Sequence, residues 1–165
     1  MSSLKRALVL GALVGTAAMV SVGLMAQAPD PLVGTWKINL AKSTFSPGPA
    51  PKSQTLTITV AGQGMKVNVQ GVDGQGKPTS TQYTANYDGK DYPVTITGAA
   101  AADYDHVVLK RIDARTSETT RKKTGKVVQT VRRVVSQDGK TLTTTATGMN
   151  AQGQKVNNVT VYDKQ

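Results

Sequence analysis

The chain has 165 residues, with 20 Lys and Arg against 10 Asp and Glu, which gives a formal net charge of +10. It contains no Cys, so disulfides, a lipid-modified cysteine and a Cys nucleophile are all excluded. Aromatic residues make up only 4% of the sequence, so a core must be built largely from Val, Ile, Leu, Ala and Thr methyl groups. The basic balance favours anionic partners.

Residues 1–28 have the pattern of a secretory signal peptide. Lys5 and Arg6 form a positive start, residues 7–26 are apolar or small, and Ala26-Gln27-Ala28 fits a small-x-small cleavage site. Pro29 would follow that cut directly and fits it poorly, so a nearby cut or retention as an N-terminal anchor stays open. We expect a periplasmic or secreted protein whose residues 29–165 form one domain.

Those residues are predicted to form β-strands joined by Gly-containing turns. The clearest signal is Asp138-Gly139 between two Thr/Val-rich runs, because both central residues of a type I′ hairpin turn need positive φ. Prolines 47, 49 and 51 predict an extended connection over residues 42–53. In chain order we expect strands over residues 33–39, 54–61, 64–72, 79–87, 92–97, 106–113, 115–123, 126–136, 140–147 and 155–164.

About ten strands with short connections, and no amphipathic helix, indicate an all-β, up-and-down antiparallel sheet. Left open, such a sheet would expose long edges, and closing it into a barrel removes them. Closure requires strand 33–39 to meet strand 155–164. A barrel of this size has room inside for one small ligand.

Gly34-Thr35-Trp36 on the first strand, followed by an antiparallel meander, resembles the calycin superfamily of lipocalins and fatty-acid-binding proteins. The ending Val161-Tyr162-Asp163-Lys164 is similar to the last strand of the fatty-acid-binding group. The GTWK start and the repeated Asp-Gly-Lys turns are also similar to poorly characterised secreted bacterial lipocalin-like domains. The resemblance implies a barrel that binds a small ligand.

The chain departs from fatty-acid-binding proteins in two places. Those proteins carry two helices between their first two strands, where this chain has its proline-rich connection. Their last strand also carries Arg-x-Tyr, the pair that holds the ligand carboxylate. The matching positions here read Thr160-Val161-Tyr162, so Tyr162 carries over and the arginine does not.

Trp36 is the only tryptophan of the chain. We expect it, with Gly34 beside it, to plug the base of the barrel, its indole N–H bonded locally. Stacking of the indole on a ligand is the alternative interpretation.

Two pairs of adjacent cations, Arg132/Arg133 and Lys110/Arg111, lie inside predicted strands. Neighbouring strand residues face opposite sides, so one member of each pair is expected to point into the barrel. An unpaired cation there is costly and should meet a carboxylate, a tyrosine or an anionic ligand. A β-bulge, or inward side chains that reach water at the rim, is the alternative. Alternation does not decide which arginine faces inward.

Residues 110–133 hold nine Lys and Arg against Asp113 and Glu118. Such a field attracts nucleic acid, anionic membrane surfaces or acidic glycans. Export and the lack of interleaved aromatic residues disfavour nucleic acid. A weak contact with an anionic membrane surface stays open, and a solvated basic wall is the plainer interpretation.

His106 is the only histidine, near Asp103 and Asp105. One His and two loop carboxylates do not specify a metal site. The sequence contains no Gly-x-Ser-x-Gly and no His-Glu-x-x-His motif. We therefore expect no metal and no cofactor, and catalysis is not favoured.

Together these observations predict an exported, monomeric, calycin-like barrel that binds a small amphipathic or acidic molecule in its interior. An alternative from another class is a structural or envelope-interaction protein with a filled barrel and a basic surface. A weaker third hypothesis is an isomerase or hydrolase that works at the barrel mouth. The candidate ligand-binding residues are Arg132, Arg133, Lys110, Arg111 and Tyr162.

Overall fold

The computed structural model describes residues 29–98 and 103–165. The predicted signal peptide, residues 1–28, lies outside the described residues, as does part of the loop predicted at 98–105. Within the described part no helix has the length and apolar character needed to cross a membrane.

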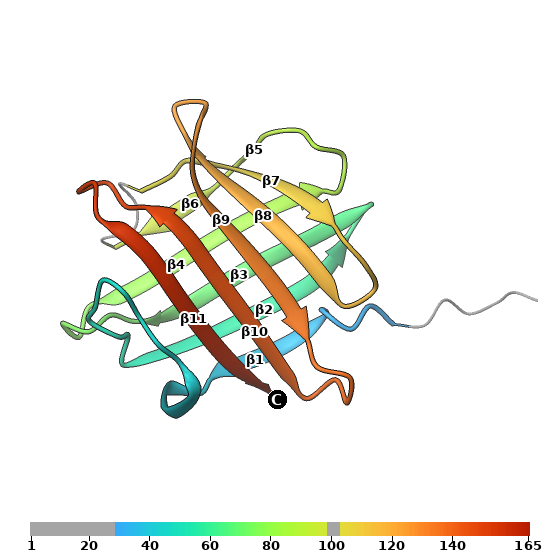
Figure 1. The fold of residues 1–165 in the computed structure, drawn as a ribbon. Coiled ribbons are helices and arrows are strands. Elements are labelled where there is room, and N and C mark those ends of the chain that lie inside the picture. Colours follow the sequence, from blue (N-terminus) through green and yellow to red (C-terminus); the bar gives the residue numbers. More distant parts are fainter. Residues whose placement is uncertain (1–28, 99–102) are drawn as a thin grey trace, which may run out of the picture.

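The described residues form one antiparallel sheet of eleven strands that rolls into a nearly closed barrel (Figure 1). The predicted fold class, an antiparallel β-barrel, is confirmed. A single 3-10 turn, η1 (Leu40–Lys42), follows the first strand. The strands are β1 (Gly34–Ile38), β2 (Ser53–Ala61), β3 (Gly64–Val72), β4 (Pro78–Asn86), β5 (Tyr92–Pro93), β6 (Thr95–Thr97), β7 (His106–Arg111), β8 (Thr116–Lys123), β9 (Lys126–Val135), β10 (Thr141–Met149) and β11 (Lys155–Lys164).

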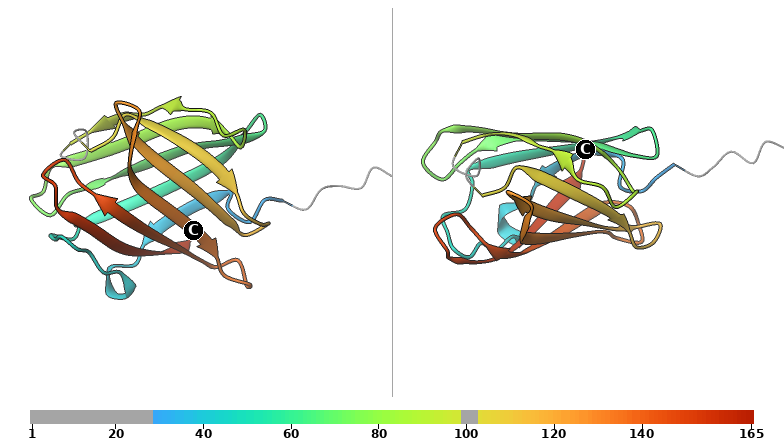
Figure 2. Two further views of the ribbon diagram at one scale, coloured as in Figure 1. Left: turned by 45° about the horizontal axis from the view of Figure 1, so that its top comes forward. Right: turned by 90° about the horizontal axis from the view of Figure 1, so that it is seen from above.

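The first and last strands meet, as the sequence predicts for a closed barrel. β1 lies between β11 and β2, with Trp36 opposite Lys164 on one side and opposite Leu56 on the other. All other neighbours in the sheet are antiparallel too, and the order is β5-β7-β8-β9-β10-β11-β1-β2-β3-β4-β6. Figure 2 shows the barrel flattened, with the blue-to-green strands facing the yellow-to-red ones.

The segment 92–97, expected as one short strand, is instead divided between the two edges of the sheet. β5 pairs with β7, whereas β6 pairs with β4. Pro93 has no N–H to continue a ladder, and the next amide, Val94 N, donates to Asp105 O at 3.0 Å. The segment therefore crosses from one edge to the other and joins them, which makes eleven strands where about ten were expected.

Strand alternation sends one set of side chains into the barrel, and this set differs between the two ends. Toward the end that holds Leu32 and Trp36, most of the inward side chains are apolar and buried. Toward the other end, inward positions carry Arg, Gln and Thr, such as Gln129, Arg133 and Thr144. We call the first end the base and the second the mouth. The polar set leaves the interior incompletely filled.

Candidate ligand-binding site

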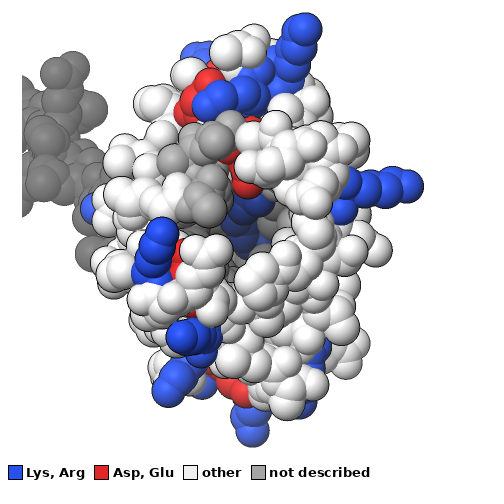
Figure 3. Space-filling model, turned by 90° about the vertical axis from the view of Figure 1, so that its left-hand side faces the viewer, with Lys and Arg blue, Asp and Glu red and all other residues white. Residues whose placement is uncertain are grey.

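A cavity of about 370 Å³ occupies the mouth half of the barrel and opens to solvent. Figure 3 looks into a hollow of the surface with basic side-chain atoms at its bottom. The basic residues that line the cavity are Arg121 and Arg133, and the tyrosines are Tyr83, Tyr104 and Tyr162. Apolar side chains, among them Leu56, Val69 and Val131, complete the wall.

The proline-rich connection forms one side of the mouth. It first follows β11, where Thr44 N donates to Val159 O at 2.8 Å and Asn157 N donates to Ser46 O at 2.7 Å. Its prolines 47, 49 and 51 then line the cavity. Pro49 reaches the β3–β4 turn so closely that a Cβ on Gly74 would lie 2.6 Å from Pro49 Cγ. The proline-rich connection therefore covers part of the opening at the mouth of the barrel.

Arg133 is the inward member of its pair, with only 4% of its surface exposed, while Arg132 is exposed. β9 alternates regularly from Gln129 to Val135, with odd-numbered residues buried. The Arg133 guanidinium donates from Nη2 to Tyr83 Oη at 3.0 Å and from Nη1 to Thr119 Oγ1. Its Nε is buried and has no hydrogen-bond partner among the described residues.

No carboxylate compensates this buried charge. All 10 acidic residues of the chain lie in the described ranges, and none of them forms an ion pair with Arg133 there. Tyr83 and Thr119 are neutral, so they supply acceptors but no negative charge. A buried cation without a counter-charge carries a large desolvation penalty, of several kcal/mol as an order of magnitude.

Tyr162 lies on the same cavity, 5% exposed, at the end of β11. Its Oη donates to Gln54 Oε1 at 2.6 Å. Burial raises the pKa of Tyr162 to about 12, although the positive charges of Arg133 and Arg121 act in the opposite direction. The phenol is therefore neutral at physiological pH and acts as a hydrogen-bond donor.

The deep wall of the cavity is rich in donors. Tyr83 Oη and Thr119 Oγ1 already accept from Arg133, and Gln54 Oε1 accepts from Tyr162. Of the residues that line the cavity, the Tyr83 hydroxyl hydrogen, the Gln54 amide N–H groups and the buried Arg133 Nε–H remain as donors. An acceptor-only group, such as a carboxylate, complements this set.

Arg121 on β8 also faces the cavity and was not among the residues predicted from sequence. Its guanidinium carbon lies 4.4 Å from the centroid of the Tyr104 ring, and Nη1 donates to Gln129 Oε1 at 2.8 Å. Gln129 Nε2 in turn donates to Met149 O at 3.0 Å. Strand alternation from the buried Ser117 and Thr119 is the signal that could have identified it.

Lys110, proposed from sequence as a ligand-binding residue, lies on the outside of the barrel. It stands opposite Glu118 on β8, which in turn stands opposite Arg132 on β9. These three outward side chains form a cross-strand row in which one carboxylate separates two cations. Lys110 and Arg132 are therefore the outward members of their pairs and do not line the cavity.

Arg111 faces inward but lies at the base, away from the cavity. Its Nη1 and Nη2 each donate to an Asp30 carboxylate oxygen at 2.8 Å, and Nη1 also reaches Tyr87 Oη at 3.2 Å. Carbonyls of the β7–β8 turn accept from the remaining donors, Asp113 O from Nε and Ala114 O from Nη2. The Asp30 carboxylate raises the pKa of Arg111. Arg111 is thus a fully bonded structural residue.

Trp36 and Gly34 also belong to the base. The buried indole donates from Nε1 to Leu32 O at 3.1 Å, and Lys164 Nζ lies 5.0 Å from the ring centroid. Gly34 has φ +146°, and a Cβ there would meet Lys164 Cε at 3.0 Å. Neither residue lines the cavity.

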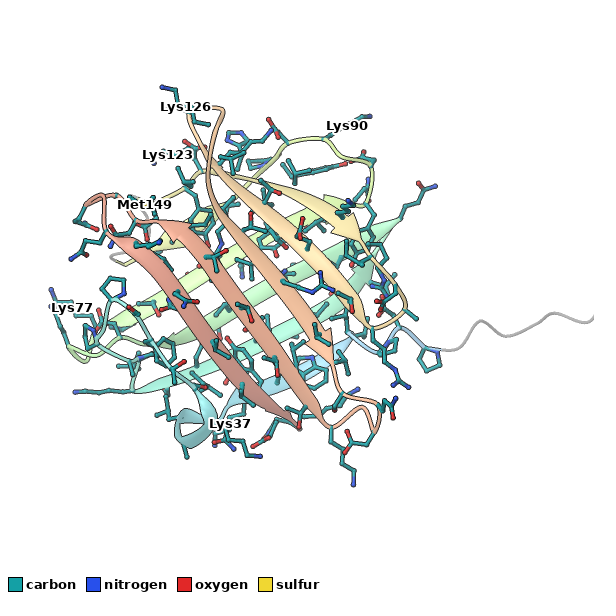
Figure 4. The ribbon with its side chains drawn as sticks, in the orientation of Figure 1. Lys37, Lys77, Lys90, Lys123, Lys126 and Met149 are labelled. Atoms are coloured by element: carbon teal, nitrogen blue, oxygen red, sulfur yellow. The ribbon has the colours of Figure 1, made fainter. Side chains whose placement is uncertain are left out.

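Most of the basic run lies on the outer surface. Lys126, at the tip of the β8–β9 hairpin, projects away from the barrel, as do Lys77 and Lys90 in other turns (Figure 4). Lys122 is bonded to Asp91, with Nζ 2.7 Å from Oδ1. The external charge is therefore spread around the barrel, which separates it from the two arginines of the cavity.

His106 and its acidic neighbours do not converge on a common point. His106 Nδ1 lies 2.8 Å from Asp105 Oδ1, whereas Asp103 Oδ1 accepts from Ala151 N at 2.8 Å. The hydrogen bonds from His106 and Thr124 N lower the pKa of Asp105. Within residues 29–98 and 103–165, no three His, Cys, Asp or Glu side chains are grouped to hold a metal ion.

Comparison with models of known protein families finds no match, and comparison with curated protein sequences finds none either.

Proposed function

We propose that this protein binds a small amphipathic molecule with a carboxylate or similar acid group inside its barrel. The observation that carries the proposal is Arg133: a guanidinium 4% exposed, on the cavity wall, with no carboxylate partner among the described residues. An anionic ligand that bonds to this guanidinium would supply the missing counter-charge and use the remaining donors.

The other properties of the cavity support the same ligand class. A volume of about 370 Å³ falls at the lower end of the usual range for small-molecule sites. Leu56, Val69 and Val131 provide apolar surface beside the donors, which favours a molecule with both an acid group and a hydrocarbon part. A hollow interior favours this role over a filled barrel that is only structural.

Two sequence features agree with the proposal. The Gly-x-Trp start and the antiparallel meander resemble calycins, which implies a ligand-binding barrel. The predicted signal peptide would place the protein in the periplasm or outside the cell, where it would meet its ligand. We expect it to act as a monomer without a cofactor.

The experiment compares two neighbouring arginines. Decanoate is titrated calorimetrically into the wild-type protein, into R133M and into R132M. Both variants lose the same charge from adjacent positions of β9, but only one of them changes the cavity wall. We expect binding to weaken about tenfold or more in R133M, since a charge-assisted hydrogen bond is lost, and to be unchanged in R132M.

Native mass spectrometry of the exported protein would identify a co-purifying acid of the expected class. Equal and small effects of the two substitutions, or no binding of decanoate or any co-purified acid to the wild-type protein, would contradict the proposed function.

A further inference from the structure

The cavity contains two arginine side chains, Arg133 deep inside and Arg121 near the mouth. Arg133 stands opposite Ser117 across the β8–β9 ladder, and Arg121 stands opposite Gln129. Their Cα positions are thus four residues apart along the strands, which corresponds to roughly 13 Å. Because the Arg133 side chain reaches back to Thr119, the two guanidinium groups are closer, roughly 7–13 Å apart.

Arg121 is held in place by neutral partners. Tyr104 covers its guanidinium, and Gln129, itself bonded to Met149 O, accepts from Nη1. Asp73 and Asp103 line the same cavity, but their carboxylates accept from backbone N–H groups and form no ion pair with Arg121. Among the described residues, then, neither cation of the cavity has an anionic partner.

Apolar side chains of β9 and β10 line the cavity beside the deep arginine. On β9, Val131 separates Arg133 from Gln129, and on β10 Ala146 separates Thr144 from Gly148. The register places Val131 directly opposite Ala146, and both line the cavity. Val131 also stands opposite Thr119, which accepts from Arg133, so this apolar surface lies next to the deep guanidinium.

We infer that the ligand is an elongated molecule with an acid group at each end and a hydrocarbon chain between them. One acid group bonds to Arg133, the chain lies along Val131 and Ala146, and the second acid group bonds to Arg121 at the mouth. The inference rests on the proposed function, because it adds a second point of contact to the same site.

The test compares decanedioate with decanoate by calorimetric titration of the wild-type protein at neutral pH. The two probes have equally long chains and differ only in the second carboxylate. We expect decanedioate to bind about tenfold tighter or more, which is the contribution of one charge-assisted hydrogen bond. Hexanedioate, which reaches both arginines when each end accepts a hydrogen bond, should show a similar advantage over hexanoate.

Two variants test which arginine binds which carboxylate of the ligand. R121Q should remove the advantage of decanedioate and leave decanoate affinity within about twofold, whereas R133M should weaken both probes about tenfold or more. The comparison of diacids with monoacids uses only the wild-type protein, so it decides the question even if R121Q does not fold.

The failures of the two proposals are distinguishable. If decanoate binds through Arg133 but decanedioate is no tighter, or if R121Q weakens both probes equally, the two-ended ligand is wrong and the proposed function stands. If neither acid binds to the wild-type protein, both proposals are overturned.

Discussion

Two inward-facing arginines distinguish the two ends of the barrel. At the base, Arg111 bonds to both oxygens of Asp30, to Tyr87 and to two turn carbonyls. In the cavity, Arg133 has only a tyrosine and a threonine, and its Nε is unbonded. The arginine at the base thus has a carboxylate partner from the protein, whereas the arginine in the cavity has none among the described residues.

The difference shows what makes a buried cation a functional candidate. Inward orientation alone does not, because Arg111 has it too. What matters is whether the protein supplies the counter-charge, since a supplied carboxylate makes the arginine part of the scaffold. This contrast leads to four predictions, two about the base and two about the cavity.

The largest effect is expected at the base. R111M should lower the free energy of unfolding by about 2–3 kcal/mol, because it leaves Asp30 unpaired; the partners are 27% and 28% exposed, so the loss falls below that of a fully buried pair. Urea unfolding measures this as a shift of the midpoint. K110M, the outward neighbour, is the control and should change stability by less than about 0.5 kcal/mol. Equal stability of the two variants would contradict the structural role of Arg111.

High pH should lower the free energy of unfolding through Tyr162, which lines the cavity. Burial raises the pKa of Tyr162 from 10.0 to about 12. The folded state therefore favours the neutral phenol, and this contribution is complete below pH 10 and is lost as the pH rises through about 12. The loss is on the order of 2 kcal/mol.

Unfolding titrations of wild type and Y162F between pH 10 and 12 measure this effect, and the wild-type curve should fall more steeply. Y87F is the matched comparison at the base. Desolvation raises the pKa of Tyr87 as well, but the Arg111 hydrogen bond offsets part of the shift, so its effect should be smaller. Parallel curves for wild type and Y162F would contradict the assignment.

R133M, unlike R111M, should not lower the free energy of unfolding. Removal of an uncompensated buried charge in favour of an apolar side chain of similar length is expected to leave the free energy of unfolding unchanged or to raise it by about 1 kcal/mol. The measurement is urea unfolding without added ligand. A loss as large as that of R111M would mean that Arg133 is also a scaffold residue.

The smallest effect is the coupling within the base. A double-mutant cycle of D30N and R111M should give a coupling energy on the order of 1 kcal/mol, because the two-point contact is partly exposed. Additive single effects would show that Arg111 acts through Tyr87 and the turn carbonyls instead of Asp30.

Much of the fold could be predicted from the sequence because strand alternation and turn residues are local signals. The β9–β10 hairpin at Asp138-Gly139 and the meeting of β1 with β11 are examples. The turn type was predicted wrongly, because Gly139 has a positive φ of 70° and Asp138 does not. The division of residues 92–97 was not predictable, because each half pairs with a strand that is distant along the chain.

The site was predicted only in part. Adjacency indicated that one of Arg132 and Arg133 faces inward, but both faces of β9 carry Val and Thr or Gln, so the pattern did not choose between them. The carboxylate partner of Arg111 could not be identified from the sequence, because Asp30 lies 81 residues away. Arg121 was missed because it is followed by Lys122 and Lys123, which resemble a solvated strand end.

The crossing segment 92–97 gives the barrel a seam. β6 pairs with β4 only over Ser80–Gln82, and β5 pairs with β7 over two residues, while no backbone hydrogen bond joins β4 to β7 in the described part. Backbone amides along this line should exchange with solvent sooner than those of β9 or β10, which have partners on both sides. The seam is also where a strand of a second molecule would find unpaired backbone groups, so crowding and heat should first cause self-association there.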